Sequence, residues 1–282
     1  MNYMSDFLCL FFFCLVVSDV SKEDWSYELC RESSEIVEEK IYKEYRIRIS
    51  ETQEMNCGLL DIEKNGKVIF HDEYSGGHFF LGSDWQKKIK PIGHLIGGDH
   101  TTLLVSLWTG GAHCCFSLHI FKLDGAFKRI GVVGDGNYYP ILEDLNGDGI
   151  YEVKFYDDFL AYVFSSFAYS AVANVILEYS DEGYKVAYKY MLKPTPSLQT
   201  QNKKIKSWNK NLRQKKHPNW PPPDLIQDFT NMVFSGNKKI ATSLLDRAWP
   251  KNLPGKEEFL AEYESVMGYS VYAEEYKLLQ KF

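Results

Sequence analysis

The residues with the clearest chemical pattern lie in one short acidic loop. Oxygen-bearing side chains occupy its positions one, three, five and nine: Asp144, Asn146, Asp148 and Glu152. The backbone carbonyl of Ile150 supplies position seven, and a glycine at position six permits a sharp turn. Calcium prefers about six to eight oxygen ligands in flexible geometry, and this spacing can wrap oxygens around one ion. The sequence therefore predicts one calcium ion with a structural role, held by these five residues.

The residues after the loop do not follow the helix-loop-helix calcium motif. Position twelve is Phe155 instead of a glutamate, and 151–156 has the residue types of a strand. The alternative interpretation is a turn rich in Asp, Asn and Gly, held by bonds from its side chains to its backbone and needing no metal.

This loop and the strand that follows it resemble the integrin-like FG-GAP and VCBS repeat proteins. The resemblance covers 144–155, and more loosely 97–156, where Gly97-Gly98-Asp99-His100 retains part of the pattern. With Gly110 to Cys115 before the loop and Ala248-Trp249-Pro250 in the tail, the chain also looks like an uncharacterised group of exported bacterial proteins. The resemblance implies an export signal and a calcium loop, and no known activity.

The first residues predict export. An uninterrupted apolar run over 7–17 is too short to span a bilayer as a helix and has the length of a signal-peptide core. Val16 and Ser18 give a cleavage pattern near Ser18, with the mature chain beginning near Asp19. No other stretch has the roughly 18 apolar residues of a transmembrane helix. We therefore expect a periplasmic or extracellular protein without a transmembrane span in its mature chain.

Four cysteines remain after the predicted signal: Cys30, Cys57, Cys114 and Cys115. An even number of thiols in an exported chain favours disulfides. The preferred pairing joins Cys30 to Cys57 and leaves the adjacent couple bridged to each other or reduced. The alternative ties Cys30 and Cys57 separately to the couple.

The adjacent cysteines also lie next to His113, with His119 four residues further on. Thiolate and imidazole ligands together suit zinc or copper. On a strand, however, consecutive side chains point to opposite faces, so neighbouring ligands cannot easily share a tetrahedral ion. A structural disulfide or a buried thiol is the favoured interpretation, ahead of a metal site or a catalytic Cys-His couple.

A basic segment over 203–216 contrasts with the acidic remainder of the chain. The formal net charge is −6, yet 193–223 contains eight Lys or Arg and no acid. Ile205, Trp208 and Leu212 fall on one helical face. We expect a helix that docks this apolar edge on the protein. The other interpretation is contact with an anionic membrane surface or a polyanion, and nucleic acid is not expected as a partner.

The periodicity predicts an α+β fold, with an antiparallel, blade-like β-domain followed by a small helical domain. Alternating or apolar runs favour strands over 45–49, 58–63, 67–70, 102–108, 114–122, 150–156, 173–179 and 184–191. Asn65-Gly66 between two of them indicates a hairpin. Apolar stripes with helical spacing follow over 225–233, 240–248, 259–267 and 276–279. The predicted organisation is a signal peptide (1–18), a helical segment (19–44), a β-rich domain (45–192), a basic linker (193–223) and a helical domain (224–282).

Two functions of different classes remain open. The first is a binding or structural module whose calcium-stabilised β-domain presents a surface to a protein or an envelope polymer. The second is a hydrolase of an envelope polymer that uses acids between Glu143 and Asp158. The sequence shows no nucleophile elbow, no His-Glu-x-x-His and no phosphate-binding glycine loop, which favours the first.

Overall fold

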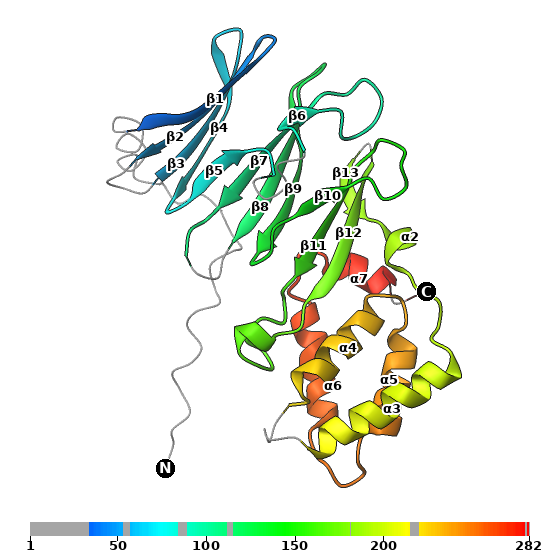
Figure 1. Ribbon diagram of the computed structural model, residues 1–282. Helices are drawn as coiled ribbons and strands as arrows, with labels where there is room; N and C mark the ends of the chain where they lie inside the picture. Colours follow the sequence, from blue (N-terminus) through cyan, green and yellow to red (C-terminus); the bar gives the residue numbers. More distant parts are fainter. Residues whose placement is uncertain are drawn as a thin grey trace, which may run out of the picture.

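A computed structural model describes residues 34–52, 57–83, 89–111, 115–180, 182–214, 220–279 and 281. Within these ranges the chain forms antiparallel sheets that follow one another and then a helical region (Figure 1). The predicted α+β class is confirmed. Among the described residues, no helix combines the length and the apolar character needed to cross a membrane. The predicted signal peptide lies outside the described residues.

The first sheet is a meander whose strands lie in chain order: β1 (Glu35–Tyr42), β2 (Tyr45–Thr52), β3 (Cys57–Lys64) and β4 (Lys67–Ser75). The hairpin predicted at Asn65-Gly66 joins β3 to β4. Asn65 has a φ of 52° and Gly66 a φ of 77°. Two successive positive φ angles give the turn the twist that matches its flanking strands.

The predicted N-terminal helix is wrong for the residues that the structure describes, because 35–42 form β1. A tight connection at Lys43, whose φ is 51°, turns the chain back into β2. Across this ladder, Glu39 lies opposite Arg48. Ile36, Val37 and Ile41 are spaced as on a helical face, yet they are β-branched and suit a strand equally well. The apolar pattern of this segment was therefore compatible with a helix or a strand, and its pairing with β2 makes it a strand.

The second sheet contains β5 (His78–Leu81), β6 (Ile92–Gly93), β7 (Thr102–Trp108), β8 (Phe116–Lys122) and β9 (Lys128–Gly136). β5 and β6 pair with opposite ends of β7, so together they occupy the place of one strand. The third sheet contains β10 (Ile141–Glu143), β11 (Glu152–Asp157), β12 (Ala173–Ser180) and β13 (Gly183–Val186), with the 3-10 helix η1 (Phe167–Tyr169) between β11 and β12. Both sheets are therefore meanders like the first.

The second and third sheets share one further feature. The pair Gly93 and Thr102 closes the loop 94–101, and the pair Glu143 and Glu152 closes the loop 144–151, which has the same length. Each loop therefore connects an edge strand to its neighbour. The loop 94–101 joins β6 to β7, and the loop 144–151 joins β10 to β11. This correspondence supports a blade-like repeat in these two sheets.

The helical region contains α2 (Tyr188–Met191), α3 (Leu198–Arg213), α4 (Pro223–Val233), α5 (Lys238–Ala248), α6 (Lys256–Met267) and α7 (Ala273–Leu279). The last four match the predicted apolar stripes. One expectation needs correction: the strand predicted over 184–191 ends at Val186 and gives way to α2. The helix expected within the basic linker is α3, which begins at a Ser197 cap and packs in the helical region.

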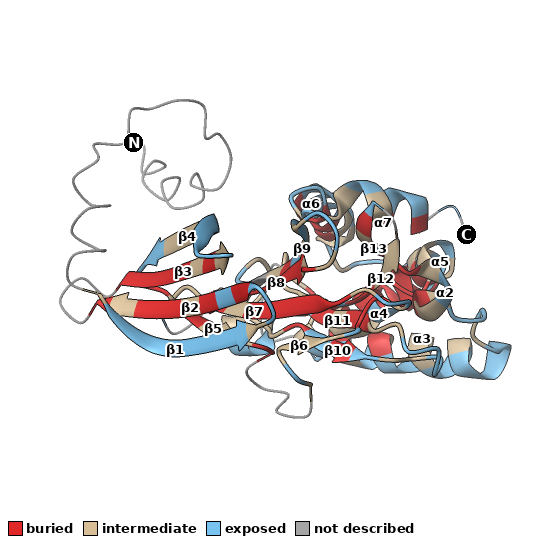
Figure 2. Ribbon diagram, turned by 90° about the horizontal axis from the view of Figure 1, so that it is seen from above, coloured by how far each residue is buried: buried red, intermediate tan, exposed pale blue. Residues whose placement is uncertain are grey.

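Two hydrophobic clusters hold these layers together. The first lies between the first and second sheets and includes Leu103 and Val105 of β7. The second takes Leu104 from the same strand and continues through the third sheet to the helices. Because successive strand residues point to opposite faces, β7 is buried on both sides, which explains its unbroken apolar run. Figure 2 shows β7 as largely buried, whereas β1 is exposed. The predicted β-rich and helical domains thus share one core.

Candidate calcium loop and its surroundings

The predicted calcium residues lie together in the loop 144–151 and at the start of β11. The Asp144 carboxylate accepts hydrogen bonds from backbone N–H groups on the far side of the loop. Its Oδ1 is 2.7 Å from the nitrogen of Gly147, and its Oδ2 is 3.0 Å from that of Gly149. Asp144 therefore closes the loop around its own side chain, as expected for the first residue of such a turn.

The middle of the loop is held by Asn146 and Asp148. The Asn146 side-chain amide donates to Asp148 Oδ2 at 2.8 Å, and the backbone N–H of Ile150 donates to Asp148 Oδ1 at 2.8 Å. These bonds, with that from Ile150 making the largest contribution, hold the pKa of the Asp148 carboxyl below its usual value. The carboxylate is thus ionised in neutral solution and available as an anionic ligand.

Glu152 lies beneath the loop with 2% of its surface exposed. Its Oε2 accepts a hydrogen bond of 2.9 Å from the backbone N–H of Leu145. Desolvation and, after it, the Glu152 carboxylate raise the pKa of the neighbouring Tyr190 hydroxyl. A buried carboxylate is costly unless hydrogen bonds or a cation compensate it. Glu152 therefore introduces a buried acid at the base of a loop that already carries Asp144 and Asp148.

The oxygen-bearing side chains of the loop are of the type that calcium prefers, but they are not gathered around one common point. The described residues contain no group of three or more His, Cys, Asp or Glu side chains close enough to hold one ion. Carboxylates that approach within a few ångströms repel one another unless a cation lies between them. Calcium binding would thus require the acids to turn inward from their present hydrogen bonds to the loop backbone.

The corresponding loop of the second sheet lies against the calcium-type loop. Ile96 and Ile150 form an antiparallel bridge, and the backbone N–H of Tyr151 donates to the carbonyl of Leu95 at 2.8 Å. These contacts join the two loops directly. A change in the order of the loop 144–151 can therefore be transmitted to the second sheet.

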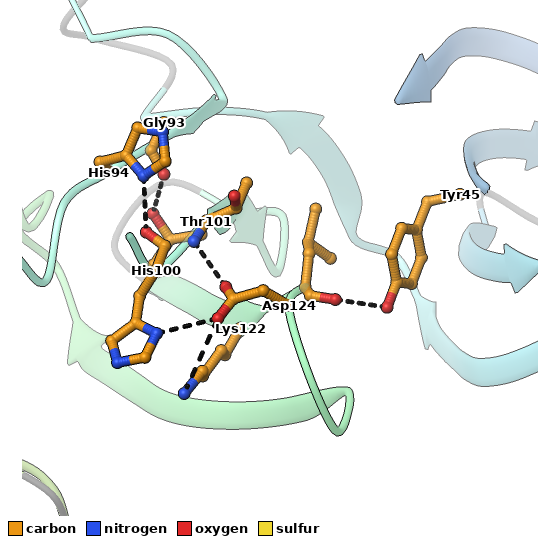
Figure 3. A network of polar contacts seen from close by, with 9 residues as sticks. Tyr45, Gly93, His94, His100, Thr101, Lys122 and Asp124 are labelled. Carbon is orange, nitrogen blue, oxygen red and sulfur yellow. Dashed lines mark hydrogen bonds and ion pairs between the residues drawn. The ribbon is translucent and has the colours of Figure 1, made fainter. Parts of the chain in front are cut away.

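The loop 94–101 is held by Asp124 from the connection between β8 and β9. Figure 3 shows His100, Thr101 and Lys122 directed at this carboxylate. His100 Nδ1 lies 2.8 Å from Asp124 Oδ2, and the N–H of Thr101 donates to Asp124 Oδ1 at 2.5 Å. The strand pairing places His94 at the first position of this loop, where Asp144 stands in the calcium-type loop. The Nδ1 of His94 contacts the carbonyl oxygen of His100. A carboxylate from another part of the chain thus holds the end of this loop.

Cys57 and Cys115 are both in the disulfide-bonded state. Cys30, His113 and Cys114 lie outside the described residues, so the predicted pairing of Cys30 with Cys57 stays a prediction, as does the zinc or copper alternative. His119, the other histidine of that alternative, is buried beside the rings of Phe79 and Phe121.

Two pairs of adjacent glycines, Gly76-Gly77 and Gly110-Gly111, have a structural role that the sequence analysis did not predict. A Cβ on Gly110 would lie 2.2 Å from the carbonyl oxygen of Gly76, and a Cβ on Gly58 would lie 2.5 Å from that of Gly77. These positions bring the ends of the first and second sheets into backbone contact. Their repetition in the sequence was the available signal.

The acids considered for a hydrolase each have a structural partner. Glu143 pairs with Lys154 at 2.7 Å on the surface. Asp157 accepts hydrogen bonds of 2.6 Å from the hydroxyls of Ser270 and Tyr276, which connect β11 to the C-terminal helices. Burial raises the pKa of the Asp157 carboxyl, and the two hydroxyls oppose this rise. Asp157 thus joins the sheet to the helices.

The predicted apolar face of the basic segment is confirmed. Trp208 and Leu212 of α3 are 2% and 1% exposed, and Ile205 packs against the same core. The indole Nε1 of Trp208 donates to Asp228 Oδ2 at 2.9 Å, and Lys204 pairs with the other oxygen of this carboxylate. α3 is therefore a docked helix whose apolar side is buried.

Comparisons of the chain with family models, curated proteins and solved structures found no match. The resemblance to the FG-GAP and VCBS proteins rests on the loop residues quoted above and stays a prediction.

Proposed function

We propose that this protein is an exported binding module whose β-sheets are stabilised by one calcium ion in the loop 144–152. The observation that carries this proposal is the position of the Glu152 carboxylate, buried directly beneath a loop that presents Asp144 and Asp148. An acidic loop of this spacing supplies the oxygen ligands that calcium prefers, and an ion that binds only the folded loop adds to the stability of the folded state.

The proposed role of the ion is structural. The loop 144–151 contacts the loop 94–101 through Tyr151 and Leu95, so an ordered calcium loop would hold the second and third sheets in a fixed relation. The acids near the loop are engaged in ion pairs or hydrogen bonds that connect elements. These contacts favour a rigid scaffold for binding over a catalytic site.

The export component of the proposal is supported by the apolar run over 7–17 and by the disulfide-bonded state of Cys57 and Cys115. Disulfides persist in oxidising compartments outside the cytoplasm. N-terminal sequencing of the protein recovered from its host should give a chain that starts near Asp19. An intact Met1 in the soluble cytoplasm would contradict export.

Calcium titration tests the site directly. We expect the chelator-treated protein to bind one calcium ion per chain in isothermal titration calorimetry, and Asp148→Ala to abolish this binding because it removes the central carboxylate of the loop. Asp99→Ala is the matched control, since Asp99 lies in the corresponding loop of the second sheet and should leave binding unchanged. Absence of binding by the wild type, or equal binding by Asp148→Ala, would contradict the proposed site.

A further inference from the structure

The exposed side of α3 carries a row of cations. Lys203, Lys206, Lys210 and Arg213 are all exposed. A helix turns by about 100° per residue, so these four side chains fall within an arc of about 80°. Trp208 lies on the opposite side of the helix, within the core. The buried and the charged sides of α3 are thus cleanly separated.

Few negative charges offset this row. α3 contains no acidic residue, and none of its four exposed cations forms an ion pair with a described residue. Arg247 of α5, also exposed, extends the row, because its guanidinium lies 3.5 Å from Asn202 Oδ1. We call Lys203, Lys206, Lys210, Arg213 and Arg247 the basic stripe. It concentrates positive charge on a protein whose formal net charge is −6.

The shape of the basic stripe favours an extended ligand. From Lys203 to Arg213 the helix rises by about 15 Å, with neighbouring stripe cations about 5 Å apart along the axis. A single small anion could contact only a part of such a row. A polymer with regularly spaced negative charges can contact several of these cations at once.

Burial of the apolar face argues against membrane insertion. An amphipathic helix that binds a bilayer buries its apolar side among the lipids. In α3 that side is already packed in the core, through Trp208 and Leu212. Only the charged side remains available, so the contact that α3 can offer is electrostatic.

We propose that the basic stripe binds a linear anionic polymer of the cell envelope, in which phosphate or carboxylate groups recur along the chain. This inference names the partner of the binding module and rests on the proposed function for the location outside the cytoplasm. It does not depend on the calcium loop, which lies between the strands β10 and β11.

Long-chain inorganic polyphosphate and sodium polygalacturonate are suitable probes for the two charge types, with orthophosphate and galacturonate as monomer controls. We expect binding of at least one polymer at low ionic strength, no binding of the monomers at equal charge concentration, and loss of binding in about 0.5 M salt. The variant with Lys203, Lys206, Lys210 and Arg213 all changed to Gln should bind at least about tenfold more weakly.

The matched control changes Lys40, Lys67, Lys90 and Lys128 to Gln. These exposed lysines lie outside the helical region, and their loss alters the net charge equally. Equal weakening by the two variants would overturn the proposal, because net charge alone would then explain the binding. Binding to vesicles containing phosphatidylglycerol without binding to either polymer would also overturn it, in favour of a membrane surface.

Repeating the polymer-binding measurements in the presence of chelator tests the basic stripe independently of the calcium site. Polymer binding should persist without calcium. Calcium binding without polymer binding would contradict the basic stripe as a binding surface, and polymer binding without calcium binding would contradict only the calcium site.

Discussion

Gly110→Ala is expected to lower the free energy of unfolding by about 2 to 5 kcal/mol. Gly110 has a φ of +80°, where a side chain adds roughly 1–2 kcal/mol of backbone strain. The new Cβ would also lie 2.2 Å from the carbonyl oxygen of Gly76. Because that atom belongs to the backbone, the ends of the first two sheets must move apart. Urea denaturation followed by circular dichroism measures the loss.

Gly125→Ala is the matched control for this substitution. Gly125 has a φ of +65°, but a Cβ there would meet nothing within 4 Å. It should therefore show the backbone strain alone, of roughly 1–2 kcal/mol. Equal losses in the two variants would show that close approach of Gly110 and Gly76 contributes nothing to stability.

His119 is expected to make the protein less stable in acid. Its side chain is 6% exposed, and burial lowers its pKa from 6.5 to about 4, with Arg129 acting in the same direction and Asp72 opposing. Between these values the unfolded chain binds the proton and the folded chain does not. The contribution of His119 to the free energy of unfolding is therefore fully present above pH 6.5 and declines as the pH falls toward 4. The full contribution is about 3 kcal/mol.

The experiment compares the pH dependence of unfolding in the wild type and in His119→Leu. The difference between the two curves isolates His119, since Asp157, whose pKa is raised, contributes with the opposite sign in both proteins. We expect the variant to lose the decline between pH 6.5 and 4. His94→Leu, which removes an exposed histidine, controls for the loss of a histidine side chain as such. Parallel curves for the wild type and His119→Leu would contradict a depressed pKa at His119.

Features with strong local signals were predictable from sequence. The Asn65-Gly66 turn, the apolar strand β7 and the apolar face of α3 all follow from residues close in the chain. The residues of the predicted calcium loop could be named for the same reason, because their spacing is local, and calcium binding by them stays a prediction. Elements without such signals were missed: β9 is interrupted by glycines, and β5 and β6 are too short to show a period.

Contacts between distant residues were beyond sequence reasoning. Tyr276 and Asp157 are 119 residues apart, and neither position indicates the other until α7 is placed against β11. The burial of His119 depends in the same way on the first sheet covering the second. Sequence patterns give the elements, whereas the identity of such partners is decided by how the layers pack.

Thermal unfolding in calcium and in chelator tests the central claim most directly. Calcium at 100 times its dissociation constant should add about 2.7 kcal/mol to the stability of the folded state and raise the melting temperature by several degrees. Asp148→Ala should remain folded and show no calcium-dependent rise, whereas Asp99→Ala should retain it. Identical melting curves for the wild type in calcium and in chelator would contradict the account and would leave 144–152 a turn held by its own hydrogen bonds.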